Sequence, residues 1–151
     1  MIDIENLSSF SIDEKNVKNY VGQMLKHLGV NKDSYVSILF VEENEMASQH
    51  LKWMKEPGPT DVMSFPMDDV LLSNKKSLKK QSMLGDIIIC PSIAYKDAIK
   101  QSIPPAKHLV FLLAHAILHL LGQDHQAPGQ RGIMQKKEQG IMNSLRIVKK
   151  R

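Results

Sequence analysis

A long, mostly apolar stretch, "PPAKHLVFLLAHAILHLLG" at residues 104–122, predicts the helix around which the rest of this chain packs. It is apolar on nearly every side, as a core helix is. Gly122 is expected to end it, because glycine readily takes the positive φ of a helix C-terminus. The overlapping stretch "HAILHLLGQDH" at residues 115–125 nevertheless places three of the six histidines among these apolar side chains.

The histidine spacing predicts a metal site. His115 and His119 are four residues apart, so they stack on one helical face with Cβ atoms about 6 Å apart. After a turn at Gly122, His125 can supply a third ligand. A lone core histidine usually bonds a backbone carbonyl, but three imidazoles buried together without a shared cation leave nitrogens unpaired, at about 1–3 kcal/mol each. We therefore predict one catalytic Zn²⁺ per chain on His115, His119 and His125, with one position left for water.

The same spacing occurs in the metzincin metalloproteases. In those enzymes the first histidine is followed by a glutamate that acts as the general base. Ala116 occupies that position here. A peptidase of this type is therefore disfavoured, although the ligand geometry is retained.

Composition sets the broad class. The 151 residues, 42% of them hydrophobic, are enough for one domain with a sizeable core, so a single domain over residues 1–151 is expected. The net charge of +4 mildly favours a polyanionic partner, and lysines gather in "SNKKSLKK" at residues 73–80, although a solvated loop explains such a run equally well. Cys90 is the only cysteine, and "MIDIENLSSF" lacks the order of a signal peptide, so a cytoplasmic protein without a membrane segment is expected.

Hydrophobic periodicity predicts an α+β fold: a small mixed sheet packed with helices, with the histidine helix in the core. Ser11 is expected to cap the first helix, and the lysine run is expected to be a loop. Three prolines around "DVMSF" indicate an edge strand. The expected strands are residues 34–42, 61–65 and 83–90, and the expected helices besides the histidine helix are 11–29, 43–54, 91–102 and 131–146.

A zinc hydrolase also needs a carboxylate that orients the water or fixes a ligand histidine. Asp61 and Asp124 have a local explanation as turn residues, whereas Asp86, in the otherwise apolar strand "LGDIII", has the weakest structural reason to be there. Asp86 is therefore the preferred candidate. His108, seven residues before His115, lies near the same helical face, but it is expected to be partly exposed and is given no role.

Three blocks, "HAILHLLGQDH", "TDVMSFP" and "LGDIII", resemble the signature blocks of the YbeY family of bacterial metal-dependent endoribonucleases. Met134 and Glu138 also match the family's M-x-x-x-E. The resemblance covers most of residues 35–146. It implies that the three histidines bind zinc, and that the chain is an endoribonuclease that prefers single strands and acts on ribosomal RNA precursors in ribosome maturation and quality control. Ribosomal proteins are expected as further partners, and DNA is not.

The sequence departs from the family pattern at several positions. Ala116 replaces a usual glycine and Gln123 a usual tyrosine. Met54 replaces an arginine six residues before the threonine, and only Lys55 next to it could supply the positive charge, without the arginine fork that grips phosphate. Two alternatives therefore stay open: a zinc hydrolase with another substrate, and a ribosome-associated assembly factor with a structural metal and little nuclease activity. The oligomeric state also stays open.

Overall fold

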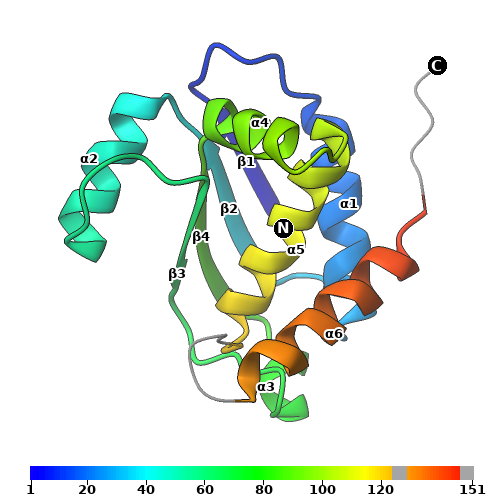
Figure 1. The fold of residues 1–151 in the computed structure, drawn as a ribbon. Helices are drawn as coiled ribbons and strands as arrows, with labels where there is room; N and C mark the ends of the chain where they lie inside the picture. The colour runs from blue at the N-terminus through cyan, green and yellow to red at the C-terminus, as the bar shows by residue number, and fades with distance from the viewer. Residues whose placement is uncertain (124–128, 147–151) are drawn as a thin grey trace.

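The computed structural model describes residues 1–123 and 129–146, which form a four-stranded mixed sheet packed with helices (Figure 1). The sheet order is β1-β2-β4-β3; β1, β2 and β4 are parallel, and β3 runs antiparallel to β4 at one edge. The strands are β1 (Ile2–Asn6), β2 (Tyr35–Phe40), β3 (Val62–Pro66) and β4 (Met83–Ile89). The helices are α1 (Glu14–His27), α2 (Glu43–Met54), α3 (Lys75–Lys79), α4 (Pro91–Lys100), α5 (Pro105–Leu120) and α6 (Gln130–Ser144).

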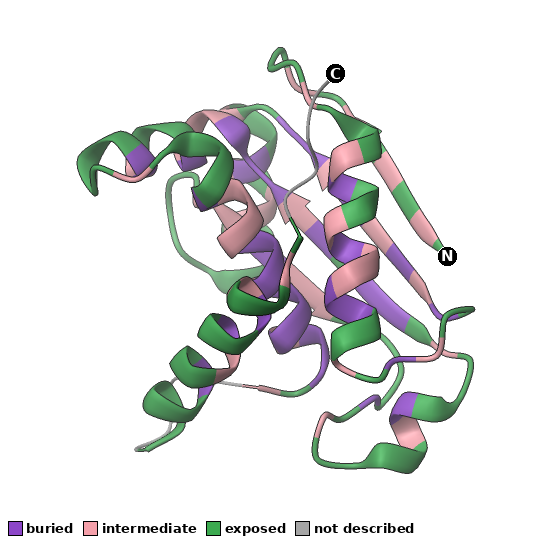
Figure 2. Ribbon diagram, turned by 90° about the vertical axis from the view of Figure 1, so that its right-hand side faces the viewer, coloured by how far each residue is buried: buried purple, intermediate pink, exposed green. Residues whose placement is uncertain are grey.

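The main core lies between the inner face of the sheet and the helices α1 and α5. Alternate residues of the two central strands point into it, among them Ile38 of β2 and Ile87 of β4. Helix α5 is buried along most of its length, whereas α6 shows an exposed outer side in Figure 2 and packs on α5 through Met134 and Ile141. The apolar stretch of the histidine helix is thus explained by burial on several sides.

The outer face of the sheet is divided into two parts. A small second core, made by Val41, Met46, Met63 and Cys90, lies under α2, and Trp53 of α2 packs edge-on against Phe65 of β3. Beside it, polar residues at neighbouring register positions, Asp3, Ser37 and Asp86, occupy the same outer face.

The expected α+β fold is confirmed, including the helix over residues 43–54 and β3 as an edge strand. Strand β1 was not expected, and it forms by pairing in parallel with β2, which lies far along the chain. The lysine run contains the short helix α3, whose first amides are capped by Asn74, so the expectation of a loop was wrong there. Asp13, not Ser11, caps α1: its side chain accepts a hydrogen bond from the amide of Asn16.

Gly85 fixes the contact between the two strands at the β3 edge. Its φ is +138°, and a Cβ there would lie 2.1 Å from the carbonyl oxygen of Phe65. Only glycine therefore allows β3 to approach β4 in this register.

Among the described residues, no single helix is long and apolar enough to cross a membrane, and α4 and α5 would reach that length only together, across a 115° bend.

Candidate metal centre

His115 and His119 lie on the last two turns of α5 and direct the same ring atom at each other. Their Nε2 atoms are 3.1 Å apart, and the two rings are close to perpendicular, at 77°. Two nitrogens bound to one tetrahedral zinc at 2.0–2.1 Å would be about 3.3 Å apart. The pair therefore has the separation that two ligands of one ion require, as the four-residue spacing predicts.

Glu138 of α6 contacts the imidazole of His115 on the side away from His119. Its Oε2 lies 2.6 Å from Nδ1 of His115, and the residue is 5% exposed. Because the carboxylate accepts, the N–H of His115 belongs on Nδ1, which leaves the lone pair of Nε2 facing His119. A metal-binding histidine commonly has such a carboxylate behind it, which fixes its tautomer and orientation.

From the sequence, Glu138 stands out only as part of a motif, and it was not among the candidate carboxylates. A signal was present, because Met134, Glu138 and Ile141 follow the spacing of one helical face. Both apolar members of that face are buried against α5. A carboxylate between two core residues needs a buried partner, and that partner is His115.

The third predicted ligand, His125, lies outside the described residues, and so does Asp124. Zinc binding by the three histidines therefore stays a prediction. The described donors fit it, because two imidazole nitrogens converge and a buried carboxylate orients one of them.

Asp86, the carboxylate preferred from the sequence, does not lie beside the histidine pair. Asp86 of β4 pairs with Phe65 of β3 and is exposed on the outer face of the sheet. Ser64, one residue before Phe65, faces the opposite way and donates a hydrogen bond to the carbonyl of Ala116 in α5, at 3.3 Å. Asp86 and α5 are therefore on opposite faces of the sheet. This placement gives no support to Asp86 as the group that positions a ligand histidine, and a contribution to catalysis stays a prediction.

Lys55 caps the C-terminus of α2 with a left-handed backbone, at φ 58°, and it is exposed. Met54, the last residue of α2, is 57% exposed. Helix α2 packs through Trp53 on the outer face of β3, whereas α5 lies along the inner face. The structure thus does not bring Lys55 into contact with the histidine pair, and its predicted role in catalysis is untested.

A second group of donors lies at the other end of α5. Asp61, Asp97 and His108 place one donor atom each within 4.8 Å of one another, an arrangement that could hold a metal ion. His108 is 5% exposed, so the expectation of a partly exposed side chain was wrong. Burial raises the pKa of the Asp61 carboxyl, and the nearby charge of Asp97 adds to the effect.

Lysines gather near the histidine end of α5. The backbone amide of Leu72, just before α3, donates to the carbonyl of Leu121, just after α5, at 3.0 Å. A pocket of about 450 Å³ brings Lys75 and Lys79 of α3 together with Lys137 of α6. Lys137 precedes Glu138 in α6, and Leu72, which bonds Leu121 after the histidine helix, also lines this pocket.

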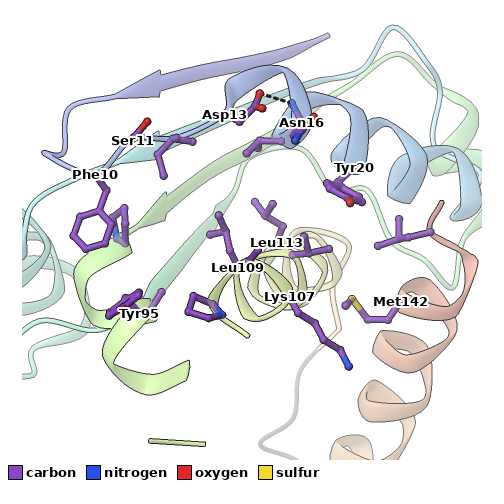
Figure 3. Close-up of a pocket in the computed structure, with 18 residues that line it drawn as sticks. Phe10, Ser11, Asp13, Asn16, Tyr20, Tyr95, Lys107, Leu109, Leu113 and Met142 are labelled. Carbon is purple, nitrogen blue, oxygen red and sulfur yellow. Dashed lines mark hydrogen bonds between the residues drawn. The ribbon is translucent and has the colours of Figure 1, made fainter. Parts of the chain in front are cut away.

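A larger pocket, of about 790 Å³, lies between the segment before α1, α1 itself, α4 and α5 (Figure 3). Its walls are mostly apolar, with Leu109 and Leu113 of α5 at the centre of the view and Tyr95 of α4 at one side. By helical spacing, Leu109 and Leu113 face away from His108 and His115. This pocket is therefore separate from both groups of metal donors.

The comparisons with known proteins agree on one family. The family model described as Endoribonuclease YbeY matches residues 3–146. A relative of that name from Clavibacter michiganensis subsp. michiganensis is 39% identical over 129 residues, which are 85% of this chain and 84% of the relative. One from Cutibacterium acnes is 37% identical over 134 residues, 89% of this chain and 86% of the relative.

The fold is also similar to a solved structure. The solution structure of a protein from Thermotoga maritima has a TM-score of 0.66 and 25% identity, and the match covers 95% of this chain and 88% of that one. Sequence blocks, family model and fold point the same way. The chain belongs to the YbeY family of endoribonucleases.

Proposed function

We propose that this protein is a zinc-dependent endoribonuclease that prefers single-stranded RNA and acts on ribosomal RNA precursors in the cytoplasm, with ribosomal proteins as further partners. One observation carries the proposal: the Nε2 atoms of His115 and His119 converge to 3.1 Å while buried Glu138 holds the first ring from behind. Membership of an endoribonuclease family supports RNA as the substrate.

The protein's part in the reaction is to hold ligands in place. His115 and His119, with His125 as the resemblance implies, would bind a zinc ion, which supplies Lewis-acid polarisation of a phosphodiester and a water of lowered pKa. Glu138 keeps the lone pair of His115 directed at the ligand position. Neutral imidazoles leave the ion its full charge, which suits an anionic substrate.

The lysines of α3 and α6 would attract the RNA backbone. Lys75, Lys79 and Lys137 line one pocket beside the histidine end of α5. Each lysine that neutralises a phosphate of a single strand contributes about 0.7 to the slope of log affinity against log salt. Replacing Lys75 and Lys79 together by Gln should therefore reduce that slope by about 1.4. The same double change at Lys15 and Lys18, exposed on α1, is the control.

The decisive experiment is cleavage of ribosomal RNA by zinc-loaded protein, with and without ribosomal proteins present, compared with chelator-treated protein and with His119→Ala. His50→Ala is the matched control, because His50 bonds the carbonyl of Gly58 on α2's side of the molecule. Cleavage that chelation and His119→Ala abolish, and that His50→Ala retains, supports the proposal. Metal-loaded protein that cleaves no RNA overturns it.

A second candidate function, an assembly factor with a structural metal, is favoured by one observation. Met54 occupies the position at which the family carries an arginine, so a phosphate-binding fork is missing there. Met54 is 57% exposed, and Arg can replace it without entering the core. If that deficit limits the rate, Met54→Arg should raise cleavage without changing zinc content. RNA binding without cleavage in both proteins would favour the assembly factor.

A further inference from the structure

Three elements meet at the end of α5 that is remote from the histidine pair. Asp61 comes directly before β3, Asp97 lies in α4, and His108 lies in the first turns of α5. One donor atom of each lies within 4.8 Å of the other two. The backbone around them is fixed, because the amide of Cys90 donates to the carbonyl of Asp61 and the amide of His108 to that of Pro104.

The histidine of this group is buried without a hydrogen bond at one nitrogen. Nε2 of His108 has no partner among the described residues, and the residue is 5% exposed. Its ring stacks on Phe111, with the centroids 6.3 Å apart and the planes inclined by 20°, which restricts its rotation. A buried ring nitrogen without a hydrogen bond is costly. This ring also places a nitrogen within 4.8 Å of a carboxylate oxygen of Asp61 and of Asp97, and it forms a hydrogen bond with neither among the described residues.

The charge of the group is also unbalanced. No lysine or arginine in the described ranges 1–123 and 129–146 forms an ion pair with Asp61 or Asp97. Burial and the neighbouring carboxylate of Asp97 both disfavour the charged form of Asp61, which raises its pKa. A bound cation would remove both penalties.

We propose that Asp61, Asp97 and His108 form a second metal site, which takes a divalent first-row cation. One imidazole and two carboxylates are a donor set that Mn²⁺ accepts, since it combines oxygen ligands with nitrogen. Donors bound to one such ion lie about 3 to 3.5 Å apart, so the present spread of up to 4.8 Å closes by small rotations of the carboxylates.

The two sites hold separate ions. His108 and His115 are seven residues apart on one side of α5, which is about 10 Å along the helix. The ring of Phe111 lies between them, 6.3 Å from the ring of His108 and 6.2 Å from that of His115. The proposal therefore does not depend on zinc binding by the histidine pair or on nuclease activity.

The test is a titration of the full chain with Mn²⁺ alone, followed by electron paramagnetic resonance of the free ion, in the His119→Ala background that disables the other site. We expect one Mn²⁺ per chain. Asp97→Asn keeps the shape of a partly exposed side chain and should weaken this binding at least tenfold, and His108→Gln should do the same. Asp69→Asn, a change at an exposed loop residue, should leave the affinity within twofold.

Thermal unfolding supplies a second readout. Mn²⁺ should raise the melting temperature of the His119→Ala protein and of its Asp69→Asn variant, and should leave that of Asp97→Asn unchanged. The inference is overturned if the His119→Ala protein binds no Mn²⁺, or if Asp97→Asn binds it as tightly as the parent.

Discussion

Replacing Glu138 by Gln tests whether this carboxylate prepares His115 as a metal ligand. The side chain keeps its volume but loses its charge. The contact it makes, 2.6 Å from Oε2 to Nδ1 of His115, is short and partly buried, and a hydrogen bond to a charged group of this kind is worth about 1.5–3 kcal/mol. Changes to such supporting groups typically lower metal affinity 10- to 100-fold, or by about 1.4 to 2.8 kcal/mol.

The Gln oxygen can still accept the hydrogen bond, so Glu138→Gln should fall near the tenfold end of that range. Glu138→Ala leaves Nδ1 of His115 without its partner and should fall near the hundredfold end. Zinc affinity is measured by competition with a chromophoric chelator at fixed pH, and circular dichroism melting checks that each variant is folded. Glu5→Gln, which removes an exposed carboxylate from β1, should change nothing.

The zinc affinities of the two Glu138 variants, compared with that of the parent, decide the role of this carboxylate. If folded Glu138→Gln and Glu138→Ala both bind zinc within twofold of the parent, Glu138 does not prepare the ligand, and its contact with His115 serves packing only. If the parent itself binds no zinc, the metal centre is wrong, and the role of Glu138 falls with it.

Further predictions concern stability and titration. Gly85→Ala should lower the free energy of unfolding in urea by about 3 kcal/mol or more, because its Cβ would lie 2.1 Å from the carbonyl oxygen of Phe65 at a positive φ. Gly140→Ala, in an open position of α6, should instead raise the free energy of unfolding by about 0.5–1 kcal/mol. If the two variants change stability equally, the close approach of β3 to Gly85 does not exclude a side chain. The Ser92 hydroxyl donates to Glu43 and lowers its pKa, with Lys96 adding to the effect. A lowered carboxyl pKa gives stability above the unfolded-state pKa that is lost as pH falls through the folded-state value. Ser92→Ala should therefore raise the Glu43 pKa measured by NMR titration, and less stability should be lost when Glu43 is protonated at acid pH. An unchanged Glu43 pKa would contradict the hydrogen bond from Ser92.

Local sequence was sufficient for most of the elements. Helical periods predicted α1, α2, α4, α5 and α6, and strand patterns predicted β2, β3 and β4, because the spacing of apolar residues within a segment reports its local structure. The pairing of His115 with His119 was predictable for the same reason, since residues four apart on a helix are neighbours. Strand β1 was not predicted, because its partner β2 begins about thirty residues further along the chain and supplies all of its strand-pairing hydrogen bonds.

What the sequence determined by itself was therefore local: the histidine pair, the helix that carries it, the edge character of β3 and the family blocks. Only the tertiary structure decided which carboxylate meets His115, because Glu138 reaches it from a helix 23 residues further along the chain, while Asp86 is turned to the other face of the sheet. It also decided that Asp61, Asp97 and His108 face one another. Contacts between elements depend on how faces pack and which side of a strand a residue takes, and no spacing within one segment encodes them.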